Sequence, residues 1–586
     1  MHRLKYPIGA ALVVIIAAMC GCQMFGDPPR LSTNPTRPIE ATGGYNVRAF
    51  GATGDGKTID TPAINKAIET AEAAGGGTVY FPAGTYACYS IRLKSNIALY
   101  LDQGATILAA DPPPQREGGG YDPPEPNQWG DAYRYQDFGH THWRNSLIWG
   151  ENLENISILG PGRIDGKGLT RGGLPKGWYR NPATAPWQPR EVAAAAAAME
   201  PSTQAATREY DPTTTPGAST RYPPRRNRPN DWLPDGIGNK AISLKLCRNV
   251  VMKDFTIYRG GHFGILATGV DNWTMDNLKI DTNRDGVDID CCRNVRMSNC
   301  SVNSPADDGI CPKSSFALGY ARSTENVTIT NCQVSGYETG SFLDGTYKPI
   351  ARNNPTGRIK FGTESNGGFK NITVSNCVFS YCRGIALETV DGALLEDVTF
   401  NNITMRDIVN SPIFLRLGSR MRGPDDVPVG QLRRIIISNI VCYNADYRYG
   451  CIISGVPNHS IEDVKIDNVR IYYKGGGTKQ LATSRPAERE TTYPEPAMFG
   501  HIPAYGFFVR HVKDIELNNI KVGYDETDYR PPFQLIDVQG SEFFRIRAEH
   551  EPDVPIFHLK NVTGFNAHDC EGLADTKRDK VEEEKL

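Results

Sequence analysis

NVRMSNC (Asn294–Cys300), NVTITNC (Asn326–Cys332) and NITVSNC (Asn371–Cys377) are three copies of one phrase, and this phrase decides the fold. In each copy apolar residues alternate with polar ones, which is the periodicity of a β-strand with one buried face. Looser copies of the phrase begin at Asn249, Asn272, Asp397, Arg434, Asp463 and Asp514. A strand repeated along most of a chain predicts a solenoid of stacked coils rather than a β-sandwich.

Most copies carry an asparagine at the sixth place, namely Asn277, Asn299, Asn331, Asn376, Asn402, Asn439, Asn468 and Asn519. Successive asparagines are 22 residues (Asn277 to Asn299) to 51 residues (Asn468 to Asn519) apart, so short coils carry insertions of variable length. Asparagine tolerates a left-handed backbone and its amide can bond the next copy, so we expect a ladder of asparagines. The sequence therefore predicts an all-β fold, a right-handed parallel β-helix.

Cysteines and charge exclude several classes of site. Cys300, Cys332 and Cys377 share one place of the repeat, so we expect buried, stacked thiols. The chain has no CxxC pair, so no zinc site is predicted, and no other metal or cofactor is expected.

The 64 Lys and Arg residues nearly balance the 66 Asp and Glu residues, for a net charge of −2. Such a chain lacks the positive field of a nucleic-acid binder, and we exclude nucleic acid as a partner.

Three segments depart from the repeat. Residues 61–74, with Thr61 as N-cap and Pro62 in the first turn, predict a helix that caps the N-terminal end of the solenoid. Residues 170–235 hold Pro/Thr/Arg-rich stretches and are expected to form a mobile insertion between coils. The last stretch, 571–586, is predicted to be a charged, solvated tail. The β-helix is thus expected at 45–570, after a linker at 23–44.

The first 22 residues have the layout of a secretory signal. Basic residues precede an apolar run, Ile8–Met19, that is too short to span a membrane. Gly21 before Cys22 resembles a bacterial lipoprotein cleavage site, which predicts that Cys22 becomes the lipidated first residue. The alternative is an ordinary signal peptide. We therefore expect export, to the cell envelope or the medium, with membrane contact only through the lipid.

One group of carboxylates is clustered rather than scattered through turns. NRDGVDID supplies Asp285, Asp288 and Asp290, and PADDGICPKS supplies Asp307 and Asp308. Asp285 and Asp307 are 22 residues apart, one coil step, so they should lie about one strand spacing, ~4.8 Å, apart. Crowded carboxylates raise at least one pKa, and a pair of them, one acid and one base, is the minimum for glycoside hydrolysis. A calcium site or plain turn chemistry would explain the same residues.

Four stretches resemble glycoside hydrolase family 28, the pectin-degrading polygalacturonases. YNVRAFGATGDGKTIDTPAINKAIETAEAAGGGTVYFPAGTY (Tyr45–Tyr86) is similar to the opening of the family, and GPGRIDGKG (Gly160–Gly168) to its next landmark. The family's NTDGxD motif is matched by NRDGVD (Asn283–Asp288), and its DD motif by Asp307-Asp308. The resemblance runs from about residue 45 to residue 530. It implies a right-handed β-helix that hydrolyses a pectic polysaccharide with inversion.

The resemblance also implies roles for single residues. Asp307 would be the general acid that protonates the leaving oxygen, while Asp285 and Asp308 would hold and deprotonate the attacking water. Lys313 matches a lysine position of the family, and Asp288 closes its first acidic motif. His262 precedes Asp285 by 23 residues, close to one coil, and is expected to border the site. We take Asp288, Lys313 and His262 as candidate substrate contacts.

Two motifs of the family are altered in this chain. No histidine stands near Gly357, where the family has GHG, and rhamnogalacturonan hydrolases of the family also lack it. The family's RIK motif, which grips a uronate carboxylate, is replaced by Ala386-Leu387-Glu388. A uronate would meet the Glu388 carboxylate there instead of a bidentate cation. Arg358 and Lys360 are the candidates to bind the uronate instead, and a rhamnose-containing pectin is a candidate substrate.

Two other functions fit the same fold. In a calcium-dependent pectate lyase, Asp285 and Asp308 would hold the metal and a base would abstract a proton. A non-catalytic β-helix would bind polysaccharide without turnover, although three mutually repelling carboxylates have no use in such a module. Chelator sensitivity separates the lyase from the hydrolase. Loss of turnover without loss of binding in Asp307→Asn separates an enzyme from a binding module.

Overall fold

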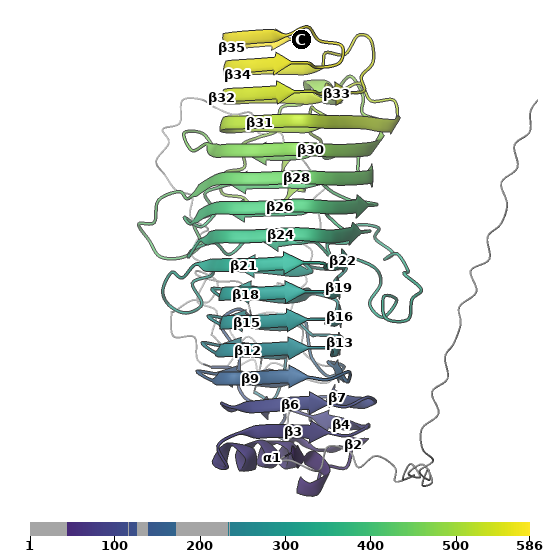
Figure 1. Cartoon of the computed structure of the whole chain (residues 1–586), viewed down its shortest axis with the longest axis vertical. Coiled ribbons are helices and arrows are strands. Elements are labelled where there is room, and N and C mark those ends of the chain that lie inside the picture. The colour runs from purple at the N-terminus through teal and green to yellow at the C-terminus, as the bar shows by residue number, and fades with distance from the viewer. Residues whose placement is uncertain (1–43, 115–116, 126–138, 172–232, 234) are drawn as a thin grey trace, which may run out of the picture. The chain divides into compact units, whose positions relative to one another are not determined.

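The computed structural model describes residues 44–114, 117–125, 139–171, 233 and 235–586. The expected signal peptide, Cys22, the linker up to residue 43 and most of the expected insertion lie outside the described residues. The described chain is a right-handed parallel β-helix, and Figure 1 shows its strands stacked from the N-terminal helix to the C-terminus. No helix of the described ranges is long and apolar enough to cross a membrane.

Each early coil contributes three short parallel strands. The first face of the solenoid is a sheet of β5 (Ile91–Arg92), β8 (Ile148–Glu151), β11 (Lys240–Lys245), β14 (Phe263–Thr268), β17 (Asp285–Asp290) and β20 (Ile310–Lys313). The second face carries β3 (Gly77–Phe81), β6 (Ile97–Leu101), β9 (Glu154–Leu159), β12 (Arg248–Lys253), β15 (Asp271–Asp276), β18 (Arg293–Ser298) and β21 (Thr324–Thr330). The third carries β4 (Gly84–Cys88), β7 (Ala105–Ala109), β10 (Arg163–Asp165), β13 (Thr256–Tyr258), β16 (Lys279–Asp281), β19 (Ser301–Asn303) and β22 (Gln333–Ser335).

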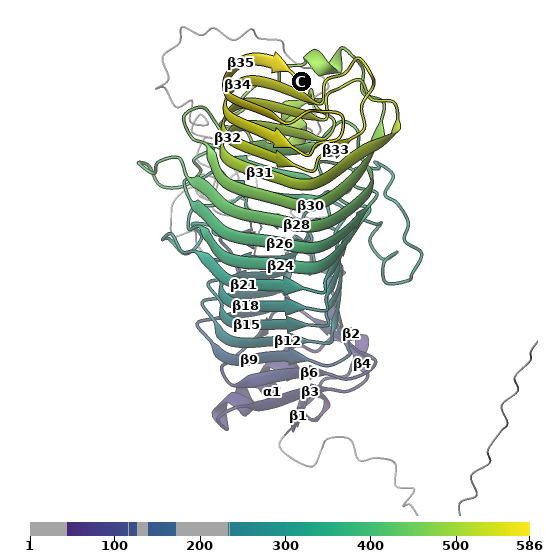
Figure 2. The same ribbon diagram turned by 45° about the horizontal axis from the view of Figure 1, so that its top comes forward.

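Later coils fuse neighbouring faces into long, bent strands, which Figure 2 shows curving around the solenoid. These strands are β24 (Phe369–Ser380), β26 (Leu394–Arg406), β28 (Gln431–Ala445), β30 (Ile461–Gly475), β31 (Phe507–Glu526), β32 (Phe533–Phe544) and β34 (Phe557–His568). The first face continues in β23 (Lys360–Phe361), β25 (Ile385–Thr389), β27 (Ile413–Leu417) and β29 (Cys451–Ser454). The short elements are β1 (Gly44–Asn46), η1 (Val47–Phe50), β2 (Asp55–Ile59), η2 (Leu481–Thr483), η3 (Pro496–Phe499) and β33 (Arg547–Ala548).

Asparagines make the bends, as the sequence predicted. All eight sixth-place asparagines have φ between 53° and 57°, the left-handed region that asparagine tolerates better than most residues. Several bond the next copy, for example Asn402 Nδ2 to Asn376 Oδ1 at 3.1 Å and Asn519 Nδ2 to Asn468 Oδ1 at 3.0 Å. The asparagines at the first place of the phrase form a second ladder, which the sequence analysis did not identify.

The core holds the apolar half of each strand phrase. Val295, Met297 and Cys300 of one copy are buried, with Val327, Ile329 and Cys332 of the next beside them, and all belong to one hydrophobic cluster. The twelve cysteines of the described chain are all buried and free. Burial of this continuous apolar column is what makes the stacked coils stable.

The helix predicted at the N-terminal end of the solenoid is present, but its N-cap differs from the expectation. Helix α1 (Thr61–Ala73) buries Ile64, Ala67, Ile68 and Ala71, and its N-cap is Asp60. Thr61 is the first helical residue, and its Oγ1 accepts a hydrogen bond from the Tyr89 N–H at 2.7 Å.

The predicted tail at 571–586 is wrong. Its residues include β35 (Thr576–Lys585), which pairs antiparallel with β34. Val581 is buried opposite Val562, and His558 Nε2 lies 3.1 Å from Glu583 Oε1. The backbone groups of the last coil provide the pairing edge that holds this charged segment in place.

Candidate active site

The aspartates of the two acidic motifs converge at the first face. β17 and β20 pair with Val287 opposite Ile310, an offset of 23 residues, so the Gly286 N–H donates to the Asp308 carbonyl at 3.0 Å. The expected one-coil partner of Asp285 was Asp307. The segment before β20 contains one extra residue, which moves Asp308 alongside Asp285. One oxygen from each of Asp285, Asp307 and Asp308 nevertheless lies within 4.8 Å of the others.

Asp285 is the carboxyl group of the cluster whose surroundings favour the protonated form. It is only 3% exposed, and its Oδ1 has no hydrogen-bond partner among the described residues. Burial, and then the carboxylates of Asp307 and Asp288, raise the pKa of Asp285 well above its ordinary value. Loss of water and like charge both disfavour ionisation.

Asp308 is also buried but remains ionised. Arg358 Nε donates to its Oδ1 at 2.9 Å, and Lys360 Nζ lies 3.1 Å from its Oδ2. Burial alone would raise the pKa of Asp308, but the charges of Lys360 and Arg358 lower it below the ordinary value. The pKa values of two adjacent carboxyl groups are thus shifted in opposite directions, an arrangement that suits acid–base catalysis.

Asp307 is the more exposed member of the cluster, with 25% of its side chain accessible. Its Oδ2 accepts hydrogen bonds from Arg284 Nη2 at 2.6 Å and Arg284 Nε at 3.1 Å. Arg284 stands where the matched motif has threonine, and the sequence analysis assigned it no role. His262 lies beside it, with Nδ1 3.1 Å from Arg284 Nη1.

A second buried group lies next to the aspartates. Lys313 Nζ is 3.1 Å from Asp288 Oδ2, 3.4 Å from Glu364 Oε2 and 2.9 Å from His140 Nε2. Despite burial, Lys313 and then His140 hold the pKa of Glu364 well below its ordinary value. His140 lies in a segment with no repeat phrase, so no sequence signal placed it here.

Arg358 and Lys360 lie beside the cluster but are themselves neutralised. Besides Asp308, Arg358 forms an ion pair with Glu495, and Lys360 Nζ donates to the Tyr493 hydroxyl at 3.0 Å. Both cations are also near Glu388, at 3.8 Å and 3.7 Å. Burial raises the pKa of Glu388 to about 8 against the opposing effect of these cations. Tyr493 and Glu495 belong to no repeat phrase or motif, and they lie in the segment between β30 and β31.

Apolar side chains cover the first face on both sides of this charged cluster. Towards the C-terminus, Phe499 and Ile502 pack on a row formed by Ala386, Phe414, Ile452 and Phe508. Towards the N-terminus, Trp143 packs with Phe263 and Leu266, and its Nε1 donates to Thr268 Oγ1 at 3.1 Å. The aspartates therefore lie between two apolar patches of the first face.

The acidic cluster does not fit a metal. The oxygens of Asp285, Asp307 and Asp308 are spaced as cation ligands could be. However, Arg284, Arg358 and Lys360 already supply positive charge to Asp307 and Asp308. A second group, Asp285, Asp288 and Cys311, has comparable spacing, but Lys313 lies against Asp288. A divalent cation would have to displace these side chains.

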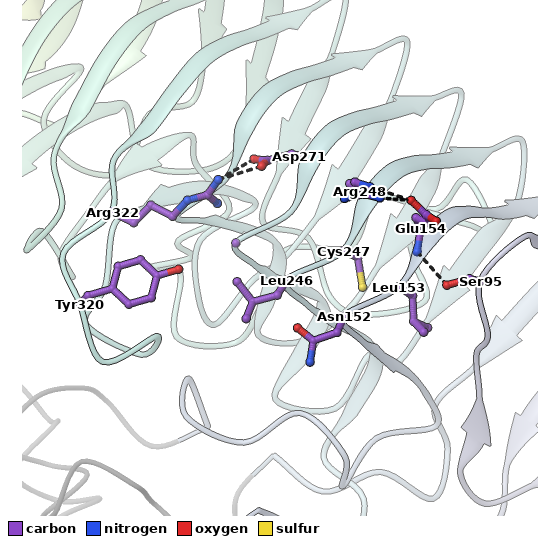
Figure 3. A pocket seen from close by; sticks show the side chains of 11 residues that line it. Ser95, Asn152, Leu153, Glu154, Leu246, Cys247, Arg248, Asp271, Tyr320 and Arg322 are labelled. Atoms are coloured by element: carbon purple, nitrogen blue, oxygen red, sulfur yellow. Dashed lines mark hydrogen bonds and ion pairs between the residues drawn. The ribbon is translucent and has the colours of Figure 1, made fainter.

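One pocket of the described chain lies away from these residues. It has a volume of about 430 Å³ and is lined by Asn152, Leu246, Arg248, Asp271, Tyr320 and Arg322 among others. Figure 3 shows Arg322 paired with Asp271 and Arg248 paired with Glu154 at its edge. None of the predicted site residues lines it, so it is not the place where the aspartates would act.

Two family descriptions match parts of the chain. Residues 44–115 match the family described as rhamnogalacturonase A/epimerase, pectate lyase-like, and residues 235–320 match the right handed beta helix region. The first match covers the stretch that resembles the opening of family 28. The second covers both acidic motifs.

Named relatives and solved structures give the same result. The chain is 27% identical over 391 residues, 64% of its length, to an exo-poly-α-D-galacturonosidase of Dickeya chrysanthemi, and 25% identical over 373 residues, 59% of its length, to a probable polygalacturonase of Vitis vinifera. These alignments span 56% and 60% of the two relatives. The fold matches an exopolygalacturonase of Thermotoga maritima with a TM-score of 0.56 at 18% identity, covering 83% of this chain and 92% of that one. In sequence and in fold, the chain is therefore similar to the polygalacturonases, the glycoside hydrolases of family 28.

Proposed function

We propose that the chain is an exported glycoside hydrolase that cleaves galacturonic-acid-containing bonds of pectin. The observation that carries the proposal is the cluster of Asp285, Asp307 and Asp308, in which one oxygen of each carboxyl group lies within 4.8 Å of the others. Its surroundings shift the pKa values of Asp285 and Asp308 in opposite directions. The named relatives support the substrate class, because two of them act on galacturonides by name. The prefix exo in both names favours attack at an end of the polysaccharide chain. The apolar side chains that cover the first face on both sides of the cluster favour the same mode of attack.

The proposed reaction is a single displacement. Asp307, the exposed member of the cluster, protonates the leaving oxygen as the bond between that oxygen and the anomeric carbon breaks. A water molecule attacks the anomeric carbon from the opposite face and gives its proton to Asp308, with Asp285 holding it in place. The products are two sugars with new hydroxyl groups, and the anomeric configuration is inverted.

The spacing of the carboxylates makes the stereochemistry the most testable part of this proposal. Oxygens of Asp307 and Asp308 come within 4.8 Å, whereas inverting enzymes usually separate their two carboxyl groups by ~6.5–9.5 Å. Incubation with galacturonan and rhamnogalacturonan oligosaccharides, followed by proton NMR, is expected to show saturated reducing ends of inverted configuration. Retained configuration would reject the single displacement. Unsaturated ends that vanish on adding a chelator would make the chain a calcium lyase, and no product from either polymer would reject the function.

We further propose that the chain reaches the cell envelope through a lipid on Cys22. The support is the sequence alone, an apolar run followed by Gly21-Cys22. Labelling of expressing bacteria with a radioactive fatty acid is expected to mark the wild-type chain and to leave Cys22→Ser unlabelled. Equal labelling of both variants, or labelling of neither, would contradict the lipid anchor and favour simple secretion. Cys20→Ser serves as the control, since it keeps the predicted cleavage site.

A further inference from the structure

Recognition of an acidic sugar needs a cation that solvent can reach. Arg358 and Lys360 have side chains only 2% and 3% exposed, and their charges are matched by Asp308, Glu388 and Glu495. Lys313 is likewise buried against Asp288 and Glu364. Arg284 has 23% of its side chain exposed, and it lies at the aspartate cluster itself.

Arg284 lies between two carboxyl groups, those of Asp307 and Asp285. Its Nε and Nη2 donate to the single oxygen Asp307 Oδ2, and its Nη2 lies 3.9 Å from Asp285 Oδ2. The second oxygen of Asp307 accepts from the Asp308 N–H at 3.1 Å instead. A guanidinium binds a carboxylate best when two nitrogens meet two oxygens, so a sugar carboxylate that offers both oxygens can compete for it.

A second arginine adds positive charge to this corner of the site. Arg171 is exposed, and its backbone oxygen lies 2.8 Å from His262 Nδ1, the nitrogen that also contacts Arg284. Partial burial, and then the charge of Arg284, lower the pKa of Arg171. Burial and the same charge lower the pKa of His262 well below its ordinary value, so the imidazole is neutral. Two arginines that repel each other beside a neutral histidine are stabilised by a bound carboxylate.

We propose that Arg284 recognises the carboxylate of the uronic acid at the cleaved bond, exchanging its ion pair with Asp307 for one with the substrate. This inference rests on the proposed function and adds to it the residue that selects an acidic sugar. It replaces the uronate-binding role considered for Arg358 and Lys360, both of which the structure buries among carboxylates.

The exchange has a consequence for the reaction. Once the guanidinium turns to the substrate, Asp307 Oδ2 loses both hydrogen bonds from Arg284 and can face the leaving oxygen of the sugar. A sugar without a negative charge leaves Arg284 paired with Asp307.

The test compares a galacturonate oligomer with its methyl-esterified form in wild type, Arg284→Gln and Arg284→Lys. Arg284→Gln is expected to lose about 10- to 100-fold in kcat/KM on the free acid, the range for losing a charge-assisted pair, and little on the ester. The loss should appear mainly in KM, because Arg284→Gln removes the partner of the sugar carboxylate and leaves Asp307 without its ion pair. Arg284→Lys keeps the positive charge but lacks the forked donors of the guanidinium, so it should recover part of the preference for the free acid over the ester. An unchanged ratio between the two substrates in Arg284→Gln would overturn the inference.

Two further measurements separate this inference from the proposed function and from misfolding. Calorimetric titration with galacturonic acid needs no turnover, so a wild type that binds it and an Arg284→Gln variant that does not would uphold the inference even if no oligomer were cleaved. Equal binding by both would reject it. Arg322→Gln is the matched control, since Arg322 forms a similar pair with Asp271 at 2.8 and 2.9 Å outside the site. Selectivity lost in Arg322→Gln as well would assign the effect to general destabilisation and contradict the proposal.

Discussion

Asp307→Asn is expected to lower kcat on a galacturonate oligomer by about 10²- to 10⁴-fold, the usual contribution of a general acid. Asparagine keeps the shape of the side chain but has no proton to give to the leaving oxygen. Substrate binding should change only a few-fold, since Arg284 remains in place and is released from its ion pair. Steady-state kinetics and calorimetric titration measure the two effects separately.

The leaving group and a control variant make this result specific to acid catalysis. A galacturonide with a good leaving group, such as a nitrophenol, needs less protonation and should lose much less rate in Asp307→Asn. Asp525→Asn, an exposed residue at the end of β31, is expected to behave as wild type. If natural and activated substrates lose rate equally, Asp307 is not the acid, and Asp285 becomes the candidate.

Arg358→Gln is expected to lower the free energy of unfolding near neutral pH by about 3–5 kcal/mol, as for other buried ion pairs that lose one partner. Arg358 is 1% exposed and is shared by Asp308, Glu495 and Glu388. Without it, Asp308 and Glu495 are left as buried carboxylates with one cation fewer. Arg248→Gln is the control, because the pair of Arg248 with Glu154 is exposed and should contribute less than about 1 kcal/mol.

The pH dependence of that loss follows from the direction of the shift at Asp308. Its pKa is lowered in the folded wild type, so its stabilisation is present above the unfolded pKa and disappears as pH falls through the folded value. The difference between wild type and Arg358→Gln should therefore be largest near neutral pH and shrink on acidification. Denaturant unfolding at several pH values measures it. A difference that is constant or grows as pH falls would show that the loss comes from packing rather than charge.

The fold could be predicted because the determinant is periodic. Alternating apolar residues and a repeated asparagine specify strand, bend and stacking together, and the structure has left-handed φ at every predicted asparagine. The prediction failed where the period ends. β35 has no repeat phrase, and its pairing with β34 depends on the edge that the preceding coils create. Likewise, one extra residue before β20 changed the partner of Asp285, because coil length sets register only when neighbouring coils are equal.

The site, like the fold, could be predicted only where it follows from the stacking of successive coils. Asp285, Asp307 and Asp308 come together because successive coils stack, which residue spacing reveals. His140, Tyr493 and Glu495 reach the site from segments outside the repeat, and no spacing rule relates them to it. Arg358 and Lys360 were placed correctly, but their burial depends on Glu495, 137 residues further along the chain from Arg358. Whether a cation is available to a ligand depends on its three-dimensional neighbours.

β35 also bears on how the molecule behaves in a crowded solution. A ladder of stacked strands has no intrinsic length, because its final strand offers the same unpaired backbone groups as every strand before it. If β34 were the last strand, a second molecule could add to it, and repeating that step would draw molecules into a fibre. β35 reverses direction, and eight of its ten residues are charged, as in the edge strands by which natural sheets discourage further pairing. Together with α1 at the other end, β35 prevents further strands from adding to the ladder.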